Sequence, residues 1–131
     1  MITNADDKMI FMDYYNQLNT LALSYFNAFA NKDINALSNL LADDVILFDP
    51  IIQEVKSKKL VLEANQNIFA GVQKIFFEQT DIFIDVEKSA IIGQLKINFD
   101  GKIIDVVDII IVNQSQLISK ITAYLDSKQV Q

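Results

Sequence analysis

The chain of 131 residues contains no cysteine and no histidine. Without cysteine it can form no disulfide and perform no thiol chemistry, which is typical of intracellular proteins, and we expect a cytoplasmic location. Without histidine it lacks the commonest general base and the commonest metal ligand. We therefore expect no zinc site, no other metal and no cofactor.

Glycine and proline are also scarce, with three residues and one residue respectively, while 51% of the residues are hydrophobic. This composition predicts a folded protein, and the length suits one compact domain over residues 1–131. The longest apolar runs have the length of a strand, so we expect no membrane-spanning helix. The N-terminal residues show neither the basic nor the apolar region of a signal peptide, and we expect none.

The charge of the chain argues against two classes of partner. The formal net charge is −6, and no stripe of basic residues is available to neutralise phosphates. We therefore expect the protein to bind neither nucleic acid nor an anionic membrane surface.

The N-terminal half of the sequence predicts three helices. The first covers about residues 6–31, where apolar residues recur at spacings of three and four. Asp33 is suited to cap a short second helix, which Asp43 and Asp44 end. Ser57 is suited to cap a third helix, which extends to about residue 70 and ends before Gly71. The apolar stripe of the first helix contains Leu18, Leu21, Ala22, Tyr25, Phe26 and Phe29, and the buried side of the second contains Ile34, Leu37, Leu40 and Leu41.

Strands follow these helices. Residues 45–49 predict a strand that Pro50 ends, with a loop over residues 51–56. From Ile82 onward apolar and polar residues alternate, which predicts strands near residues 82–87, 91–99, 103–112 and 117–125 and a hairpin turn at Asp100-Gly101. The polar tail from Asp126 is expected to fray. Helices followed by a meander of strands predict an α+β fold, with helices on one face of an antiparallel sheet.

Three residues whose side chains carry an acidic O–H group occupy positions where core residues are expected. Tyr25 lies in the helical stripe, Asp49 ends an apolar strand, and Asp108 shares a strand face with Ile104, Val106, Ile110 and Val112. Each has a structural explanation. Tyr25 could be a core aromatic, Asp49 could bond the backbone of its turn, and Asp108 could pair with a buried donor. Asp105, on the opposite face of its strand, is expected to be solvated or paired with a lysine.

The three residues also permit one kind of chemistry together. A carboxylate can remove a proton next to a carbonyl group, while a phenol and a protonated carboxylic acid donate hydrogen bonds to the resulting enolate. Because the chain has no histidine, cysteine or expected metal, this is one of the few ways it could catalyse proton transfer.

Two segments resemble a known family. Residues 24–50, SYFNAFANKDINALSNLLADDVILFDP, resemble the first helices and strand of the NTF2-like, or SnoaL-like, superfamily, and in particular its ketosteroid isomerase branch. Residues 108–125, DIIIVNQSQLISKITAYL, resemble the last hairpin of the same fold. The resemblance implies three helices packed on a curved antiparallel sheet, in a cone-shaped α+β barrel.

The resemblance also implies roles for single residues. The general base of the isomerases falls on Asp49, and the two oxyanion-hole donors fall on Tyr25 and Asp108. We expect Phe29, Leu47 and Ile110 to contact the substrate. The absence of tryptophan, and of tyrosine in the third predicted helix, departs from the isomerase pattern.

Three functions remain open at this point. The protein could be an isomerase-like enzyme acting on a small apolar carbonyl compound, a homodimeric protein that binds a small apolar ligand without turnover, or a purely structural dimerisation module. The strand over residues 103–112 is apolar on both faces, and helices cover only one face of an open sheet. We therefore expect a homodimer in all three cases.

Overall fold

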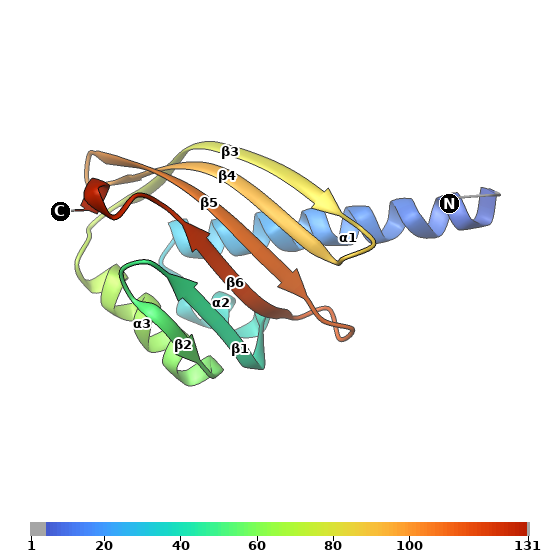
Figure 1. Cartoon of the computed structure of the whole chain (residues 1–131), viewed down its shortest axis with the longest axis horizontal. Helices are drawn as coiled ribbons and strands as arrows, with labels where there is room; N and C mark the ends of the chain where they lie inside the picture. Colours follow the sequence, from blue (N-terminus) through green and yellow to red (C-terminus); the bar gives the residue numbers. More distant parts are fainter. Residues whose placement is uncertain (1–4, 131) are drawn as a thin grey trace.

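The computed structural model describes residues 5–130 and contains three helices, six strands and a short C-terminal 3₁₀ helix (Figure 1). In chain order the elements are α1 (Ala5–Ala30), α2 (Ile34–Leu40), β1 (Leu41–Asp49), β2 (Gln53–Lys56), α3 (Lys58–Ala70), β3 (Ile75–Asp85), β4 (Ala90–Phe99), β5 (Lys102–Val112), β6 (Ile118–Tyr124) and η1 (Ser127–Val130).

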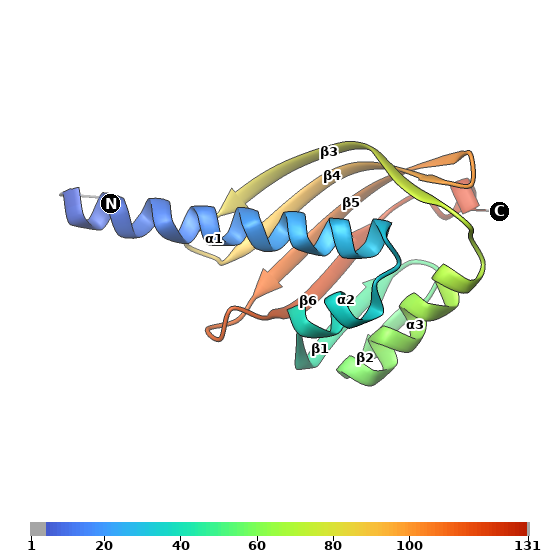
Figure 2. The same ribbon diagram turned by 180° about the vertical axis from the view of Figure 1, so that it is seen from behind.

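The six strands form one curved sheet in the order β2-β1-β6-β5-β4-β3, and all three helices lie on its concave face (Figures 1 and 2). The predicted α+β fold with three helices against one face is confirmed. The sheet remains open, and it is not entirely antiparallel, because β1 pairs with β6 in parallel. The long stretch of chain between these two strands allows a parallel pairing, which a short hairpin could not connect.

The apolar stripe of α1 packs into the concave face as predicted, with Leu18 and Ala22 fully buried. Asp33 caps α2, because its side chain accepts a hydrogen bond of 3.0 Å from the backbone N–H of Ala36. Ser57 caps α3 in the same way through the N–H of Leu60, at 3.3 Å. The predicted helix starts are therefore confirmed.

Two predicted boundaries near α2 are wrong. The helix ends at Leu40, and the buried Leu41 begins β1, so Asp43 and Asp44 belong to the strand. The register of β1 against β6 shifts between Leu41 and Ile46. Such an irregularity interrupts the alternation of sides, which explains why two successive exposed aspartates read as the end of a helix.

The predicted loop over residues 51–56 contains the short edge strand β2, which pairs with the end of β1. Strand β3 also begins earlier than expected, at Ile75. Its register against β4 shifts between Phe77 and Gln79, and the apolar alternation is broken there. Both differences arise in segments whose strand character depends on a partner more than on a local pattern.

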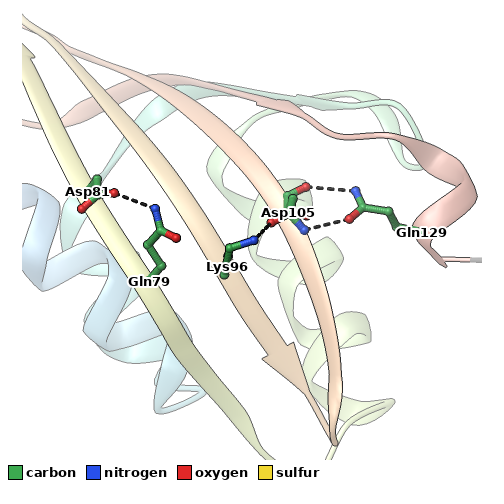
Figure 3. Close-up of polar contacts among 5 residues, drawn as sticks. All are labelled: Gln79, Asp81, Lys96, Asp105 and Gln129. Atoms are coloured by element: carbon green, nitrogen blue, oxygen red, sulfur yellow. Dashed lines mark hydrogen bonds and ion pairs between the residues drawn. The ribbon is translucent and has the colours of Figure 1, made fainter.

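The C-terminal tail is folded back onto the sheet and is not frayed over its described residues. The Gln129 side chain accepts a hydrogen bond from the Asp105 backbone N–H at 2.8 Å and donates one to the Asp105 carbonyl at 3.0 Å (Figure 3). The Asp105 carboxylate meets Lys96 Nζ at 2.6 Å, so the predicted pairing with a lysine is confirmed. These contacts hold η1 beside β5.

The convex face of the sheet carries a row of four large apolar residues and one threonine, called here the apolar row. In register across the strands lie Phe83, Ile92, Ile109, Thr122 and Phe48. Phe83 is 56% exposed. No helix among residues 5–130 covers this face (Figures 1 and 2). Within the same residues, no helix is both long and apolar enough to cross a membrane.

Candidate functional site

A cavity of about 300 Å³ lies between the helices and the concave face of the sheet. Its wall is largely apolar and aromatic, with contributions from α1, α3 and most of the strands. Four polar side chains also line it, namely Tyr25, Asp49, Asn65 and Asp108. The structure therefore brings Tyr25, Asp49 and Asp108 to one apolar cavity, although they come from three different elements.

Tyr25 reaches the cavity from the buried stripe of α1 and is 6% exposed. Its ring packs edge-on against Phe26, with centroids 5.6 Å apart. Burial, and to a smaller extent the Asp108 carboxylate, raise the pKa of Tyr25 above its usual value. Its hydroxyl therefore keeps its proton and can only act as a neutral donor or acceptor.

Asp108 enters the cavity from the inner face of β5, as the alternation of that strand predicted, and is 9% exposed. Directly opposite it lie Gly93 on β4, which has no side chain, and Ala123 on β6, whose side chain is a single methyl group. Burial, followed by the nearby Asp49 carboxylate, raises the pKa of Asp108 to about 7. A large share of Asp108 is therefore protonated at neutral pH.

The hydroxyl of Tyr25 and the carboxyl of Asp108 have no hydrogen-bond partner among residues 5–130. Over the same residues, no completely buried side-chain nitrogen or oxygen lacks such a partner. Both groups therefore keep some accessible surface, and both residues line the cavity. They lie at an apolar surface with hydrogen-bonding capacity that the protein itself does not use.

Asp49 has the turn role that its position before Pro50 suggested. Its Oδ1 accepts hydrogen bonds from the backbone N–H groups of Ile51 at 2.7 Å and Ile52 at 2.6 Å. The same residue is only partly buried and lines the cavity. Its charge lies close enough to Asp108 to affect the pKa of that group. The position of Asp49 is thus consistent both with a structural role in the turn and with a role in the candidate site.

Asn65 on α3 is the polar lining residue that sequence reasoning missed. It is 5% exposed, and its Nδ2 donates a hydrogen bond of 3.0 Å to the carbonyl oxygen of Val61. A signal was present, because Asn65 lies four residues after Val61 and four before Phe69, on the apolar side of the helix.

The predicted substrate contacts divide into two groups. Phe29 and Leu47 line the cavity. Ile110 does not line it, which corrects our expectation. It is fully buried between Ile91 and Ile121, the residues opposite it on the neighbouring strands. Ile110 thus has a large side chain on each side, whereas Asp108 has Gly93 and Ala123.

One end of the cavity reaches the surface. Ile51, which is 51% exposed, and Val130, which is 39% exposed, both belong to its wall. Val130 follows Gln129, the residue that ties η1 to β5. Among residues 5–130, no group of three or more acidic, histidine or cysteine side chains is arranged to hold a metal ion.

Solved structures with this fold come from several bacteria. A candidate polyketide cyclase from Xanthomonas campestris superimposes with a TM-score of 0.78 at 13% identity, covering 89% of this chain and 96% of the other. A candidate ketosteroid isomerase from Kribbella flavida gives 0.70 at 18% identity, covering 85% and 78%. An NTF2-like protein of unknown function from Cytophaga hutchinsonii gives 0.72 at 14% identity, covering 86% and 93%.

At these identities the structural likeness establishes the fold alone. No curated protein matches the sequence. A sequence profile of the SnoaL-like domain matches residues 22–119, which include α2, α3 and five complete strands, as well as Tyr25, Asp49 and Asp108. The match covers most of the chain, and the protein belongs to the SnoaL-like family.

Proposed function

We propose that the protein catalyses proton transfer on a small, largely apolar carbonyl compound, in the manner of a ketosteroid isomerase. One observation carries the proposal. Tyr25 and Asp108 line one apolar cavity, and neither the hydroxyl nor the carboxyl group has a hydrogen-bond partner among the described residues. Two donors held in this way suit a carbonyl oxygen on which negative charge develops.

Each residue has one role in this reaction. Asp49 removes a proton from the carbon next to the carbonyl group, and the bonding electrons move onto the carbonyl oxygen. Tyr25 and protonated Asp108 donate hydrogen bonds to that oxygen. Asp49 then returns the proton to another carbon, so that the double bond shifts and no atoms are gained or lost. Because Asp49 Oδ1 already accepts two backbone hydrogen bonds, its Oδ2 is the oxygen available for the proton.

A direct assay tests this reaction. The protein is mixed with 5-androstene-3,17-dione and with smaller β,γ-unsaturated ketones, and the absorbance of the conjugated enone is followed. We expect a rate above that of the Asp49→Asn variant for at least one of these ketones. Equal rates for both proteins on every ketone would contradict the proposal.

A second candidate is a binding protein with the same cavity and no turnover. The two backbone hydrogen bonds to Asp49 favour it, because they give this residue a structural reason to be present. In that case Asp49→Asn should leave ligand affinity unchanged, with no reaction in either protein. Ligands that leave the melting temperature unchanged across an apolar panel would count against this candidate.

We also propose that two copies pair through the convex face of the sheet. The row from Phe83 to Phe48 continues over five neighbouring strands, and no described helix covers it. A two-fold axis would bring this apolar face against itself. A cytoplasmic location stays a prediction from the absence of cysteine.

A further inference from the structure

We propose that Asn65 is a specificity residue that accepts a hydrogen bond from a hydroxyl group of the substrate, at the wall of the cavity that α3 forms. The substrate would then be a hydroxylated cyclic ketone and not a purely hydrocarbon one. This inference rests on the proposed function only for the position of the carbonyl group, which Tyr25 and Asp108 would bind.

The orientation of the Asn65 side chain follows from its contact with Val61. Its Nδ2 donates to the Val61 carbonyl oxygen at 3.0 Å. If the amide were turned around, two acceptor oxygens would face each other at this position, so the amide nitrogen must take it. The amide oxygen, Oδ1, is thereby directed away from Val61.

The amide oxygen of Asn65 has no donor among the described residues. The side chain is 95% buried, since its exposure is 5%, and it lines the cavity. No completely buried polar side-chain atom among residues 5–130 lacks a partner, so this oxygen keeps some accessible surface, and Asn65 lines the cavity. A buried acceptor without a donor destabilises the protein. A ligand that supplies an O–H group removes that cost, whereas an apolar ligand does not.

The position of α3 relative to the sheet indicates how far along the sheet the hydroxyl group lies from the carbonyl group. Helix α3 packs against β1, while Asp108 lies on β5, and only β6 separates those two strands in the sheet. Two strand spacings amount to about 10 Å. A fused bicyclic compound with oxygens at opposite ends can bridge this separation once its two hydrogen bonds are included. The cavity of about 300 Å³ also suits a compound of this modest size.

The experiment compares α-tetralone, a bicyclic ketone, with its 5-, 6- and 7-hydroxy derivatives. Their affinities are measured by isothermal titration calorimetry on the wild-type protein and on Asn65→Leu, which keeps similar bulk but removes the acceptor. Asn65→Ala serves as a second variant, in case leucine obstructs the cavity. Asn67→Leu is the matched control, because Asn67 lies on the same helix but is exposed and does not line the cavity.

We expect at least one hydroxy derivative to bind the wild-type protein about tenfold more tightly than α-tetralone. Asn65→Leu and Asn65→Ala should remove this preference, and Asn67→Leu should keep it. If no hydroxy derivative is preferred, or if the preference survives in both Asn65 variants, the inference is wrong.

A further variant separates this inference from the proposed function. Tyr25→Phe should weaken the binding of α-tetralone itself, whatever the outcome at Asn65. If Tyr25→Phe has no effect while the Asn65 variants abolish the preference, the proposed carbonyl site is wrong and the Asn65 contact holds. If none of the ketones binds, both are overturned.

Discussion

Gly93 on β4 lies directly opposite Asp108 on β5, and the space where its side chain would be is occupied by the ring of Phe26. A Cβ atom at position 93 would lie 2.7 Å from Phe26 Cζ. This glycine therefore allows α1 to approach the sheet closely. Since Phe26 and the neighbouring Tyr25 both line the cavity, the same close approach brings the Tyr25 hydroxyl to the site.

Gly93→Ala is expected to destabilise the protein by about 1–3 kcal/mol, because the added methyl group displaces the Phe26 ring. Chemical denaturation measures the difference in the free energy of unfolding. Gly71→Ala is the control, because its Cβ would meet only backbone oxygens at 3.6 and 3.8 Å, which is ordinary contact. If both variants were equally stable, the close packing of Phe26 against Gly93 would not constrain the fold.

Asp108 should make the stability depend on pH in a defined window. Its pKa is raised from an ordinary value of 3.8 to about 7 in the folded protein. The protonated form is therefore favoured by folding, and its contribution to stability is complete below about pH 4 and is lost as the pH rises to about 7. Within this window the loss is at most about 1.4 kcal/mol per pH unit.

The measurement for Asp108 is the free energy of unfolding of the wild-type protein minus that of Asp108→Asn, followed from pH 4 to pH 8. Other carboxylates titrate in both proteins and cancel in the difference, such as Asp100, whose pKa is lowered by the backbone N–H groups of Gln73 and Lys74. We expect Asp108→Asn to gain relative stability as the pH rises. A constant difference would mean that Asp108 is not buried in the way described.

Tyr25→Phe tests the proposed oxyanion site. Removing one donor from an oxyanion hole lowers kcat by about 10²–10³, and if the proposed reaction occurs we expect a loss of that order in Tyr25→Phe. Tyr14→Phe is a matched control on the same helix, since the Tyr14 hydroxyl bonds Ser89 Oγ at 2.7 Å and does not line the cavity. Similar rates for the two variants would exclude Tyr25 from the reaction.

The wild-type rate should also fall as the pH rises through about 7, because ionised Asp108 can no longer donate a hydrogen bond. In Asp108→Asn the amide remains a donor at every pH, so this decline should disappear. The check is the pH profile of kcat/KM for both proteins on one substrate. A decline of equal size in both would assign it to another group.

The C-terminal turn should depend on Gln129. In Gln129→Ala the two hydrogen bonds to the Asp105 backbone are lost, and each is worth about 0.5–1.5 kcal/mol. We expect the Asp105 amide to exchange its hydrogen faster, and ligands to dissociate faster because Val130 no longer holds its place in the cavity wall. Gln116→Ala, in an exposed turn that does not line the cavity, should change neither rate. Unchanged exchange at Asp105 would contradict the described contact.

Phe83→Asp tests the proposed dimer. A charge in the apolar row of the convex face should dissociate two copies of the 14.9 kDa chain, while the monomer keeps its fold because Phe83 is exposed. Light scattering at micromolar concentration reports the mass. Leu23→Asp, at an exposed position of α1 that is not on the sheet, should remain dimeric. A wild-type protein that is already monomeric under these conditions would end the dimer proposal.

Local patterns predicted much of the fold and part of the site. The spacing of apolar residues in α1 indicated that Tyr25 is buried, and the alternation in β5 indicated that Asp108 faces inward. The caps at Asp33 and Ser57 were also predictable, because a capping side chain bonds a backbone group only a few residues away. In each case the signal lies within one element of the chain.

The predictions that were wrong or missing concern features that depend on contacts between distant parts of the chain. Strand β2 has no apolar pattern of its own and exists through its pairing with β1. Gln129 reaches Asp105 from a distant part of the sequence, and its segment therefore read as a free tail. The spacing of Asn65 from Val61 and Phe69 indicates that it lies on the buried side of α3, but only the packing of α3 against the sheet shows that this side borders a cavity.

The periods of 3.6 and two residues are local properties of the backbone, so the order of residues alone predicts which side of its own helix or strand each residue occupies. Which of those sides come into contact depends on the packing of segments that are distant in the chain. The curvature of the sheet, the close approach of α1 at Gly93 and the small residues beside Asp108 together leave a cavity that four polar groups share. These are contacts between distant segments, and their geometry depends on how all the side chains pack at once.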